Sequence, residues 1–189
     1  MSYGVMAYLV DTDELFSLLR KEKKRGFLSS VFGKKSEQEK MIEALKPELD
    51  DLDESIQEWL DEDDENFDVP IARKVIDEFL TDNISNAYEG HVYGYVFKNI
   101  CEYKGDFLDN SEWYPCSIDS FYAIPFTEMT LPVKFPHPDD WPALGYISHT
   151  KIDLENAEYE GIDEIQKERL IDWFTRAKHT QKDIYLFMH

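Results

Sequence analysis

An apolar stripe passes through the most acidic part of the chain, and this combination limits what that part can form. Residues 48–68, ELDDLDESIQEWLDEDDENFD, hold twelve Asp or Glu and no basic side chain. Across the same region apolar residues recur mostly at steps of three and four, at Met41, Ile42, Leu45, Leu49, Leu52, Ile56, Trp59 and Leu60. Such spacing is typical of an amphipathic helix. We therefore predict one helix, or two helices broken at Pro47, whose solvated face carries the acidic side chains.

A capping motif predicts where this helical region begins. Ser36 and Glu39 have the spacing of a capping box, in which the hydroxyl and the carboxylate each satisfy a backbone N–H at the start of a helix. We expect residues 61–66 to form a loop. The region at about 36–66 is therefore predicted to be an acidic helical insert in a chain of 189 residues, a length that favours a single domain.

The rest of the chain predicts an α+β fold. Residues 3–10, YGVMAYLV, and 183–189, DIYLFMH, are apolar runs of strand length, and we expect them to pair in a small antiparallel sheet. Including the acidic insert, helical patterns predict about five helices packed on that sheet, the clearest of them at 162–177. The segment 106–140 is rich in aromatic residues and Pro, and within it residues 120–124 are a candidate edge strand.

The charge of the chain restricts its partners. With 20 Lys or Arg against 40 Asp or Glu, the formal net charge is −20. Such a surface repels nucleic acid and anionic lipid and attracts basic proteins. The N-terminus does not resemble a signal peptide, no window is apolar enough for a membrane span, and two Cys do not make a disulfide framework. We expect a cytoplasmic protein that binds neither nucleic acid nor membrane, and the sequence leaves its oligomeric state open.

Three segments together resemble a known family. They are FPHPDDWPALGY at residues 135–146, MSYGVMAYLV at the start of the chain, and HVYGYVFKNIC at residues 91–101. They are similar to a domain-of-unknown-function family of uncharacterised bacterial proteins that carries a PDDFPAIGY-like motif. The resemblance covers most of the chain and is weakest around residues 36–66. It implies a bacterial cytosolic protein with one α+β domain, and it implies no activity.

The residues that carry chemistry form no recognised catalytic motif. Cys101, Cys116 and the five His lack the close pairs of a zinc site, and the acidic run lacks the Gly and Glu positions of a calcium-binding EF-hand loop. No Gly-x-Ser-x-Gly elbow and no Gly-rich phosphate loop is present. We therefore expect no metal and no cofactor. The weak catalytic candidates are His137, Asp139, Asp140 and His149, while the turn chemistry of Asp and Pro explains the HPDD segment better than a functional role does.

The sequence favours a binding protein over an enzyme. The first hypothesis is an immunity protein or antitoxin that neutralises a basic protein partner, because complementary charge speeds and selects such encounters. Its candidate partner-binding residues are Glu48, Asp50, Asp51, Asp53, Glu54, Glu58, Asp61, Glu62, Asp63 and Asp64. One alternative is an enzyme with an acid/base site in the aromatic, Pro-rich segment 106–150. Another is a nucleic-acid mimic, in which spaced carboxylates imitate phosphates.

Overall fold

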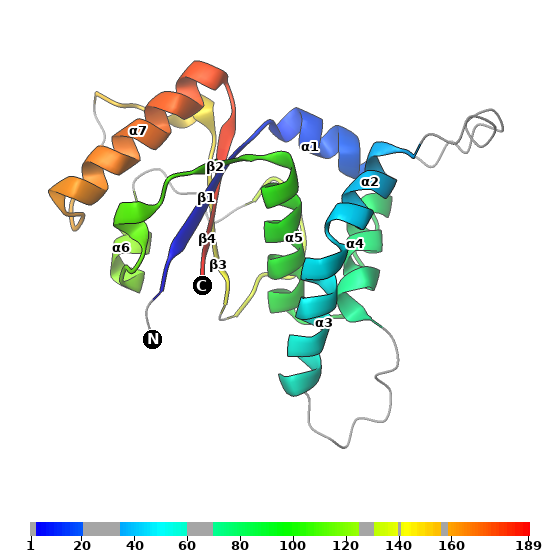
Figure 1. Cartoon of the computed structure of the whole chain (residues 1–189). Helices are drawn as coiled ribbons and strands as arrows, with labels where there is room; N and C mark the ends of the chain where they lie inside the picture. Colours follow the sequence, from blue (N-terminus) through cyan, green and yellow to red (C-terminus); the bar gives the residue numbers. More distant parts are fainter. Residues whose placement is uncertain (1–2, 21–34, 60–69, 125–130, 140, 156–158) are drawn as a thin grey trace. The chain divides into compact units, whose positions relative to one another are not determined.

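A computed structural model describes residues 3–20, 35–59, 70–124, 131–139, 141–155 and 159–189. The described residues form seven α-helices and a four-stranded antiparallel sheet. They cluster into two compact units: Met1–Thr12, Lys104–Lys134 and Asp139–His189 make up the first, and Asp13–Tyr103 with Phe135–Pro138 the second. The expected α+β class, with both terminal strands in one antiparallel sheet, is confirmed (Figure 1). A single domain with an insert at about 36–66 stays a prediction.

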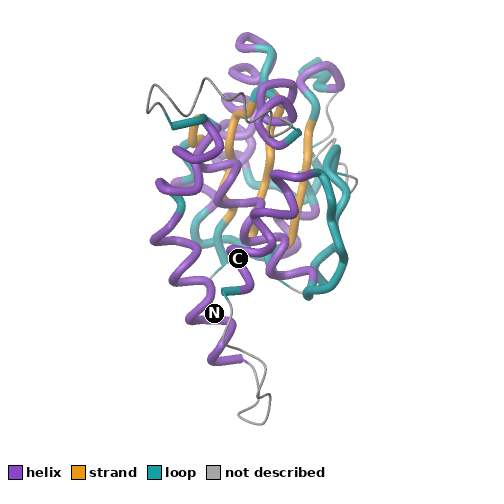
Figure 2. Tube along the Cα trace, turned by 90° about the vertical axis from the view of Figure 1, so that its right-hand side faces the viewer, coloured by secondary structure: helices purple, strands orange, loops and turns teal. Residues whose placement is uncertain are grey.

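The sheet of the first unit has the strand order β2-β1-β4-β3. Its strands are β1 (Val5–Val10), β2 (Asp106–Leu108), β3 (Ala143–Ile147) and β4 (Asp183–Met188), which lie side by side in Figure 2. The two terminal strands pair along their whole length, with Ala7 opposite Leu186. Because successive side chains of a strand point to opposite faces, this register places Val5, Ala7 and Leu9 on one face of the sheet.

A single apolar core holds the first unit together. The strand face that carries Val5, Ala7 and Leu9 is buried together with Trp173 and Phe174 of α7 (Glu164–Thr180). Asp163 caps α7, because its side chain accepts a hydrogen bond from the backbone N–H of Gln166. The remaining elements of this unit are short: the 3₁₀ helices η1 (Ser111–Trp113) and η2 (His149–Lys151), and α6 (Ile118–Tyr122).

Two differences account for the helices beyond the expected five. The expectation of an edge strand at 120–124 is wrong, because these residues lie in and directly after α6. Ser117 caps this helix by accepting a hydrogen bond from the N–H of Ser120. The acidic region supplies the other additional helix, since it forms two helices rather than one. They are α2 (Glu37–Ala44) and α3 (Lys46–Trp59), so of the two alternatives the pair of helices is the one found, and the break falls at Leu45 rather than at Pro47.

The second unit is helical. It contains most of α1 (Thr12–Leu19), with α2, α3, α4 (Ile71–Thr81) and most of α5 (Gly90–Lys104). The predicted capping box is present: Ser36 Oγ accepts from the N–H of Glu39, and the Glu39 carboxylate accepts from the N–H of Ser36. The apolar stripe of the acidic region is buried, with Met41, Leu49 and Ile56 at most 5% exposed. The pattern therefore predicts the buried side of these helices correctly.

A short segment from later in the chain completes the second unit. Phe135 packs its ring against Phe79 of α4 and against Tyr93 and Phe97 of α5, with ring centroids 5.3–6.3 Å apart. The backbone of this segment then crosses the start of α5 so closely that a Cβ at Gly90 would lie 2.2 Å from the carbonyl oxygen of His137. Only Gly fits there, so the FPHP part of the motif is explained by packing.

Candidate functional site

The acidic residues of α3 point in different directions. Glu48, Asp50, Asp51 and Glu54 are exposed, whereas Asp53 is partly buried. Asp50 pairs with Lys46, one turn earlier, at 2.7 Å. Glu48, Asp51 and Glu54 have no ion pair with any residue that the structure describes. Among the described exposed side chains of α3, these three carboxylates therefore carry negative charge that no ion pair neutralises.

Asp53 serves the fold of the second unit. Its Oδ1 accepts a hydrogen bond of 2.7 Å from the backbone N–H of Ala72, in the first turn of α4. Pro70 stands at the N-cap of that helix and makes no side-chain cap, so Asp53 supplies the missing acceptor from another helix. Burial raises the pKa of Asp53 despite its backbone hydrogen bonds from Ala72 and Ile71, and the nearby Asp50 carboxylate adds to this rise. Asp53 is thus engaged within its own unit.

Several of the predicted partner-binding residues cannot be placed. Glu58 belongs to the last turn of α3, but its side chain is outside the described residues. Asp61, Glu62, Asp63 and Asp64 also lie outside them, as does the loop predicted at 61–66. The described acidic face therefore consists of Glu48, Asp50, Asp51 and Glu54.

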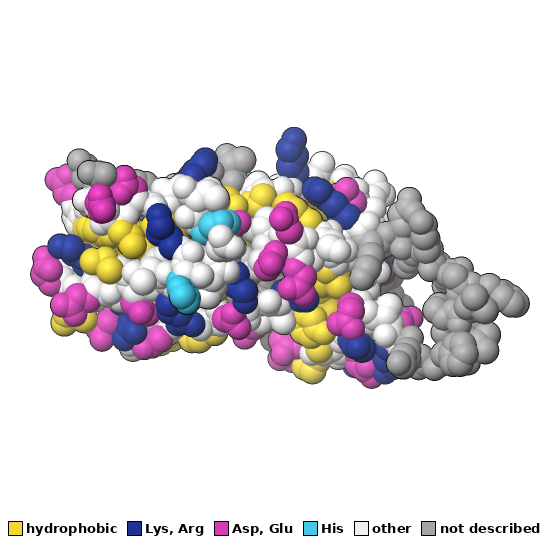
Figure 3. All heavy atoms as spheres, turned by 90° about the horizontal axis from the view of Figure 1, so that it is seen from above, with side chains coloured by type: hydrophobic (Ala, Val, Ile, Leu, Met, Phe, Trp, Pro, Cys, Tyr) yellow, Lys and Arg dark blue, Asp and Glu magenta, His cyan; other side chains and the backbone are white. Residues whose placement is uncertain are grey.

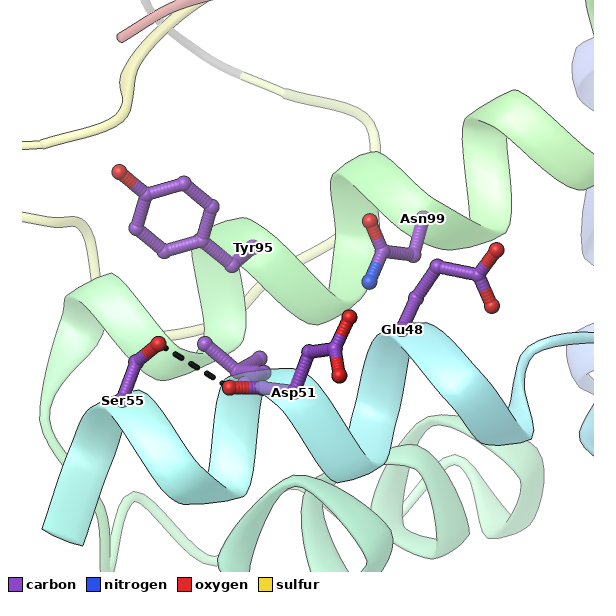
Figure 4. Close-up of a pocket in the computed structure, with 6 residues that line it drawn as sticks. Glu48, Asp51, Ser55, Tyr95 and Asn99 are labelled. Carbon is purple, nitrogen blue, oxygen red and sulfur yellow. Dashed lines mark hydrogen bonds between the residues drawn. The ribbon is translucent and has the colours of Figure 1, made fainter.

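A pocket lies beside this acidic face, between α3 and α5 of the second unit (Figure 4). Its volume is about 330 Å³, at the lower end of the range of roughly 300–1,000 Å³ found for small-molecule sites. The lining comes from both helices, with Glu48, Asp51, Leu52 and Ser55 from α3 and with Tyr95 and Asn99 from α5. Carboxylates, an amide, a hydroxyl and an aromatic ring thus surround one small space.

Asn99 is the polar residue that α5 contributes to this pocket. It is 8% exposed, and neither atom of its amide is both buried and without a hydrogen-bond partner. Figure 4 shows the amide directed from α5 toward α3 and toward the side that carries Asp51 and Glu48. The amide therefore forms a polar part of the pocket wall.

A second cluster of polar residues lies in the first unit, at the edge of the sheet where β1 and β3 finish and β4 begins. Asp183 opens β4, Thr12 follows β1, and His149 follows β3. Thr12 Oγ1 and the Tyr146 hydroxyl donate to Asp183 Oδ2 at 2.6 and 2.8 Å. The backbone N–H of His149 donates to Asp183 Oδ1 at 2.9 Å, and Nδ1 of the same residue lies 2.7 Å from that oxygen. Four contacts therefore converge on one carboxylate.

The environment of this cluster changes two pKa values. Burial opposes ionisation of Asp183, but its hydrogen bonds from Thr12, Tyr146 and His149 outweigh that effect and lower its pKa. Burial, together with the hydrogen bond to the Asp183 carboxylate and its negative charge, raises the pKa of Tyr146 to about 12. The cluster is therefore built around an ionised Asp and a neutral Tyr at neutral pH.

The imidazole of His149 is held but accessible. Its side chain is 29% exposed, whereas that of Asp183 is 9% exposed. Because the carboxylate is ionised, Nδ1 donates to it, and the neutral ring then has its free lone pair on Nε2. This is the arrangement in which a His can accept a proton from a bound molecule.

The other catalytic candidates are divided between the two units and the residues outside the described part of the chain. His137 belongs to the second unit, while Asp139 and His149 belong to the first, and Asp140 lies outside the described residues. Cys101 is buried, and burial raises the pKa of its thiol well above the ordinary value; Cys116 is free and partly buried. No group of three or more His, Cys, Asp or Glu that could hold a metal ion occurs within the described residues.

Sequence reasoning missed the partners of both sites. Asn99 follows Val96 by three residues on the buried stripe of α5, so its polar side chain at a core position was an available signal. Asp183 was predicted only as the first residue of a strand. It lies 34 residues after His149 in the sequence. Nothing local in the sequence indicates that these two residues meet.

Comparisons with known proteins give a family and no function. Within the described residues, none of the helices has both the length and the hydropathy needed to cross a membrane. Comparison with curated proteins and with solved structures found no match. One family model matches, and it covers residues 1–189. The chain therefore belongs to the family described as a domain of unknown function (DUF7691).

Proposed function

We propose that this protein binds a basic protein partner through the acidic face of α3, in the manner of an immunity protein or antitoxin. The observation that carries the proposal is the set of exposed carboxylates at Glu48, Asp51 and Glu54, which no described cation neutralises. They belong to a chain with a net charge of −20. Such a surface accelerates encounter with a cationic partner and disfavours anionic ones.

The proposal includes a bacterial, cytoplasmic setting. Both Cys101 and Cys116 are free, as is usual for proteins of reducing compartments. The resemblance of three segments to a family of bacterial proteins supports a bacterial origin. In this setting the natural partner is a basic protein produced by the same cell, and a gene beside that of this protein is the first candidate to encode it.

The test measures association with a basic protein encoded by a neighbouring gene. We expect a complex whose association rate falls steeply as ionic strength rises, because screening weakens electrostatic steering. A triple variant, Glu48→Gln, Asp51→Asn and Glu54→Gln, should slow association about tenfold or more at low salt.

A matched control removes the same number and type of charges from other exposed positions. It combines Glu160→Gln, Glu168→Gln and Asp172→Asn, which are all exposed residues of the first unit. Because both variants have the same net charge, only a local role for α3 makes the first much slower than the second. Equal rates for the two variants, or an association rate that does not depend on salt, would remove α3 as the binding face.

A second candidate function is acid/base catalysis at His149. The contact of 2.7 Å between its Nδ1 and the buried Asp183 carboxylate favours this alternative, which falls within the segment 106–150 expected from the sequence. A panel of ester, phosphate-ester and glycoside substrates tests it with wild-type protein and His149→Asn. Turnover that the substitution abolishes would support catalysis. The nucleic-acid mimic remains the third proposal, and competition between this protein and DNA for the basic partner would support it.

A further inference from the structure

We infer that the surface around α6 docks an amphipathic helix of a protein partner, one whose apolar side is flanked by Lys or Arg. Tyr114, Ile118 and Tyr122 form this surface, which we call the α6 surface, and all three belong to the first unit. The inference does not depend on the acidic face of α3, because it concerns another surface and an apolar contact.

Exposed apolar side chains are concentrated near α6. Figure 3 shows hydrophobic side chains (yellow) that are exposed on one face of the molecule. Three of the large ones lie within residues 114–122. Single exposed hydrophobic residues are ordinary, whereas a group of them marks an interaction surface. Among the described residues the large exposed hydrophobic side chains, all of the first unit, are Phe107, Tyr114, Ile118, Tyr122, Ile165 and Ile171.

The three side chains of the α6 surface are close enough to meet one partner element. Ile118 and Tyr122 are four residues apart in α6, so they lie on the same side of the helix. Tyr114 precedes Ile118 by four residues, a length of chain that spans at most about 14 Å. Tyr114 is 58% exposed and Tyr122 is 57% exposed, so both present a large part of their rings to solvent. Tyr is enriched in protein interfaces, where its ring packs and its hydroxyl stays hydrogen-bonded.

The backbone beneath the α6 surface is held by the core of the first unit. Next to the exposed residues, Trp113 and Phe121 are 0% exposed and belong to that core. Ser117 caps α6, and the N–H of Cys116 donates to the carbonyl oxygen of Tyr3 at 2.8 Å. The exposed side chains therefore lie on a fixed backbone, which reduces the conformational entropy that is lost when a partner binds.

The charges near this surface indicate a basic partner. The segment 105–133 contains five Asp or Glu and no Lys, Arg or His. Asp109 is paired with Arg169 at 2.9 Å, but Glu112 and Asp119 form no ion pair with any residue that the structure describes. Apolar side chains with unpaired carboxylates beside them complement a partner whose apolar residues are flanked by cations.

The same charges disfavour a second copy of this chain as the partner. A two-fold contact brings the same surface of both copies together, so Glu112 and Asp119 would meet their own counterparts. Each copy also has a net charge of −20. A partner strand is disfavoured as well, because strand addition needs an unpaired sheet edge and α6 is a helix. A row of side chains on one side of a helix suits a second helix that packs its own apolar row against it.

The experiment uses a designed basic helix, fluorescein-KLAKLLKKLAKLLK-amide, whose leucines all lie on one side. One control peptide has the same composition with the leucines distributed around the helix, and another has Glu in place of each Lys. Binding to the full chain is measured by fluorescence anisotropy. The two basic peptides have equal charge, so the ratio of their Kd values reports on apolar docking. We expect the designed helix to bind about tenfold more tightly than its rearranged control, and the Glu peptide to bind most weakly.

Two double variants with matched exposure locate the contact. Ile118→Ser with Tyr122→Ser changes the α6 surface, whereas Ile171→Ser with Ile165→Ser changes α7. Ile118 and Ile171 are 38% and 37% exposed, and Tyr122 and Ile165 are 57% and 59% exposed. Because all four side chains are exposed, both variants should fold normally. We expect the first variant to bind the designed helix about tenfold more weakly and the second to stay within about twofold of wild type. In NMR spectra the designed helix should shift the backbone amide signals of residues 117–122.

Four results would overturn the inference. Equal losses of affinity in the two double variants would place the apolar contact outside the α6 surface. A Glu peptide that binds as tightly as the basic one would remove the basic partner. A wild-type dimer in sedimentation velocity that the Ile118→Ser, Tyr122→Ser variant abolishes would assign the surface to a second copy. Binding to phosphatidylcholine vesicles that the same variant abolishes would assign it to a membrane.

The triple variant of α3 separates this inference from the proposed function. It should weaken both basic peptides by the same factor and leave the ratio of their Kd values unchanged, because that ratio depends on the α6 surface. If the triple variant removes the preference for the designed helix and the α6 variant does not, the helix docks on α3, and this inference fails while the proposed function stands.

Discussion

Replacement of Asp183 by Asn should destabilise the protein, because one buried carboxylate ties together the ends of three strands. The substitution keeps the size and shape of the side chain and removes its charge. Asp183 accepts from Thr12 and Tyr146 on one oxygen and from the backbone and ring of His149 on the other. An amide has only one oxygen, so whichever way it is oriented, about half of these hydrogen bonds lose their acceptor.

The size of the effect follows from the hydrogen bonds that are lost. Hydrogen bonds to a charged group contribute about 1.5–3 kcal/mol each. The amide also avoids the cost of burying a charge, and the hydroxyl groups of Thr12 and Tyr146 can rotate to accept from its NH₂, so part of the loss is recovered. We expect the free energy of unfolding to fall by about 2–4 kcal/mol at pH 7, a large part of the roughly 5–15 kcal/mol of a typical domain.

The pH dependence of the difference tests the electrostatic reasoning. The pKa of Asp183 is lowered from its ordinary value of 3.8, so its ionised form stabilises the fold above that pH, and this contribution disappears as pH falls through the lower pKa of the folded state. Asn resembles the protonated acid. The difference between wild type and variant should therefore shrink as pH falls below about pH 4.

Urea denaturation followed by tryptophan fluorescence measures this difference. Trp113, Trp141 and Trp173 all belong to the first unit, so most of the signal reports on the unit that contains Asp183. Asp172→Asn, at an exposed position of α7, is the control and should change stability by less than about 0.5 kcal/mol. A loss below about 1 kcal/mol for Asp183→Asn, or a loss that is the same at pH 7 and pH 3, would refute the reasoning.

Three further predictions concern other packed or hydrogen-bonded residues. Asp53→Ala should lower the free energy of unfolding by about 1–2 kcal/mol, because α4 loses the only cap that a described side chain gives it. Backbone amide hydrogen exchange in the first turn of α4 should become faster, and unchanged exchange would contradict this role. Gly90→Ala should cost about 1–3 kcal/mol in urea denaturation, since its Cβ would lie 2.2 Å from the His137 carbonyl oxygen, and a neutral effect would disprove the close approach. Tyr146 has a pKa raised to about 12, so wild type should lose stability between pH 10 and pH 12, by about 1 kcal/mol because partial exposure screens the interaction. Tyr146→Phe should lose less over that range, and identical pH profiles would exclude Tyr146 as the cause.

The sequence predicts those parts of the fold that local pattern controls. The two apolar runs at the ends of the chain became β1 and β4, which pair along their whole length. Ser36 and Glu39 form the predicted capping box, and the helices of the acidic region break at Leu45, just before Pro47. Each of these features depends on residues within a few positions of one another. Propensity, capping and periodicity therefore suffice to predict them.

The wrong strand prediction concerns a short segment whose conformation depends on a helix cap. Residues 120–124, FYAI preceded by Ser, have the aromatic and β-branched composition of a strand. In the structure they lie in and directly after α6, a helix of five residues. Ser117 accepts a hydrogen bond from the N–H of Ser120, and this cap stabilises the first helical turn. The cap therefore outweighs the strand preference of the residues that follow. A helix this short also has too few turns to show an apolar stripe.

Both candidate sites combine residues that lie far apart in the sequence. The acidic face of α3 was predictable, because the apolar stripe alone determines which side of the helix is solvated. Its pocket was not, since Tyr95 and Asn99 come from a helix some forty residues later. His149 was predicted as a weak catalytic candidate beside His137, but its partner is Asp183. Pairing of β3 with β4 brings these two residues together, and a sequence alone does not reveal that register.

The acidic run therefore has more than one role, and the roles follow the helical period. Asp53 faces α4 and caps it, so its charge stabilises the fold. Glu48 and Asp51 face the pocket shared with α5, while Glu54 lies exposed outside it. Because residues three or four positions apart share a side of a helix, one uninterrupted acidic stretch can supply a structural carboxylate, a pocket and a solvated surface. A count of charges treats these residues as equivalent, whereas a substitution at Asp53 should reduce stability and one at Glu48 should reduce binding.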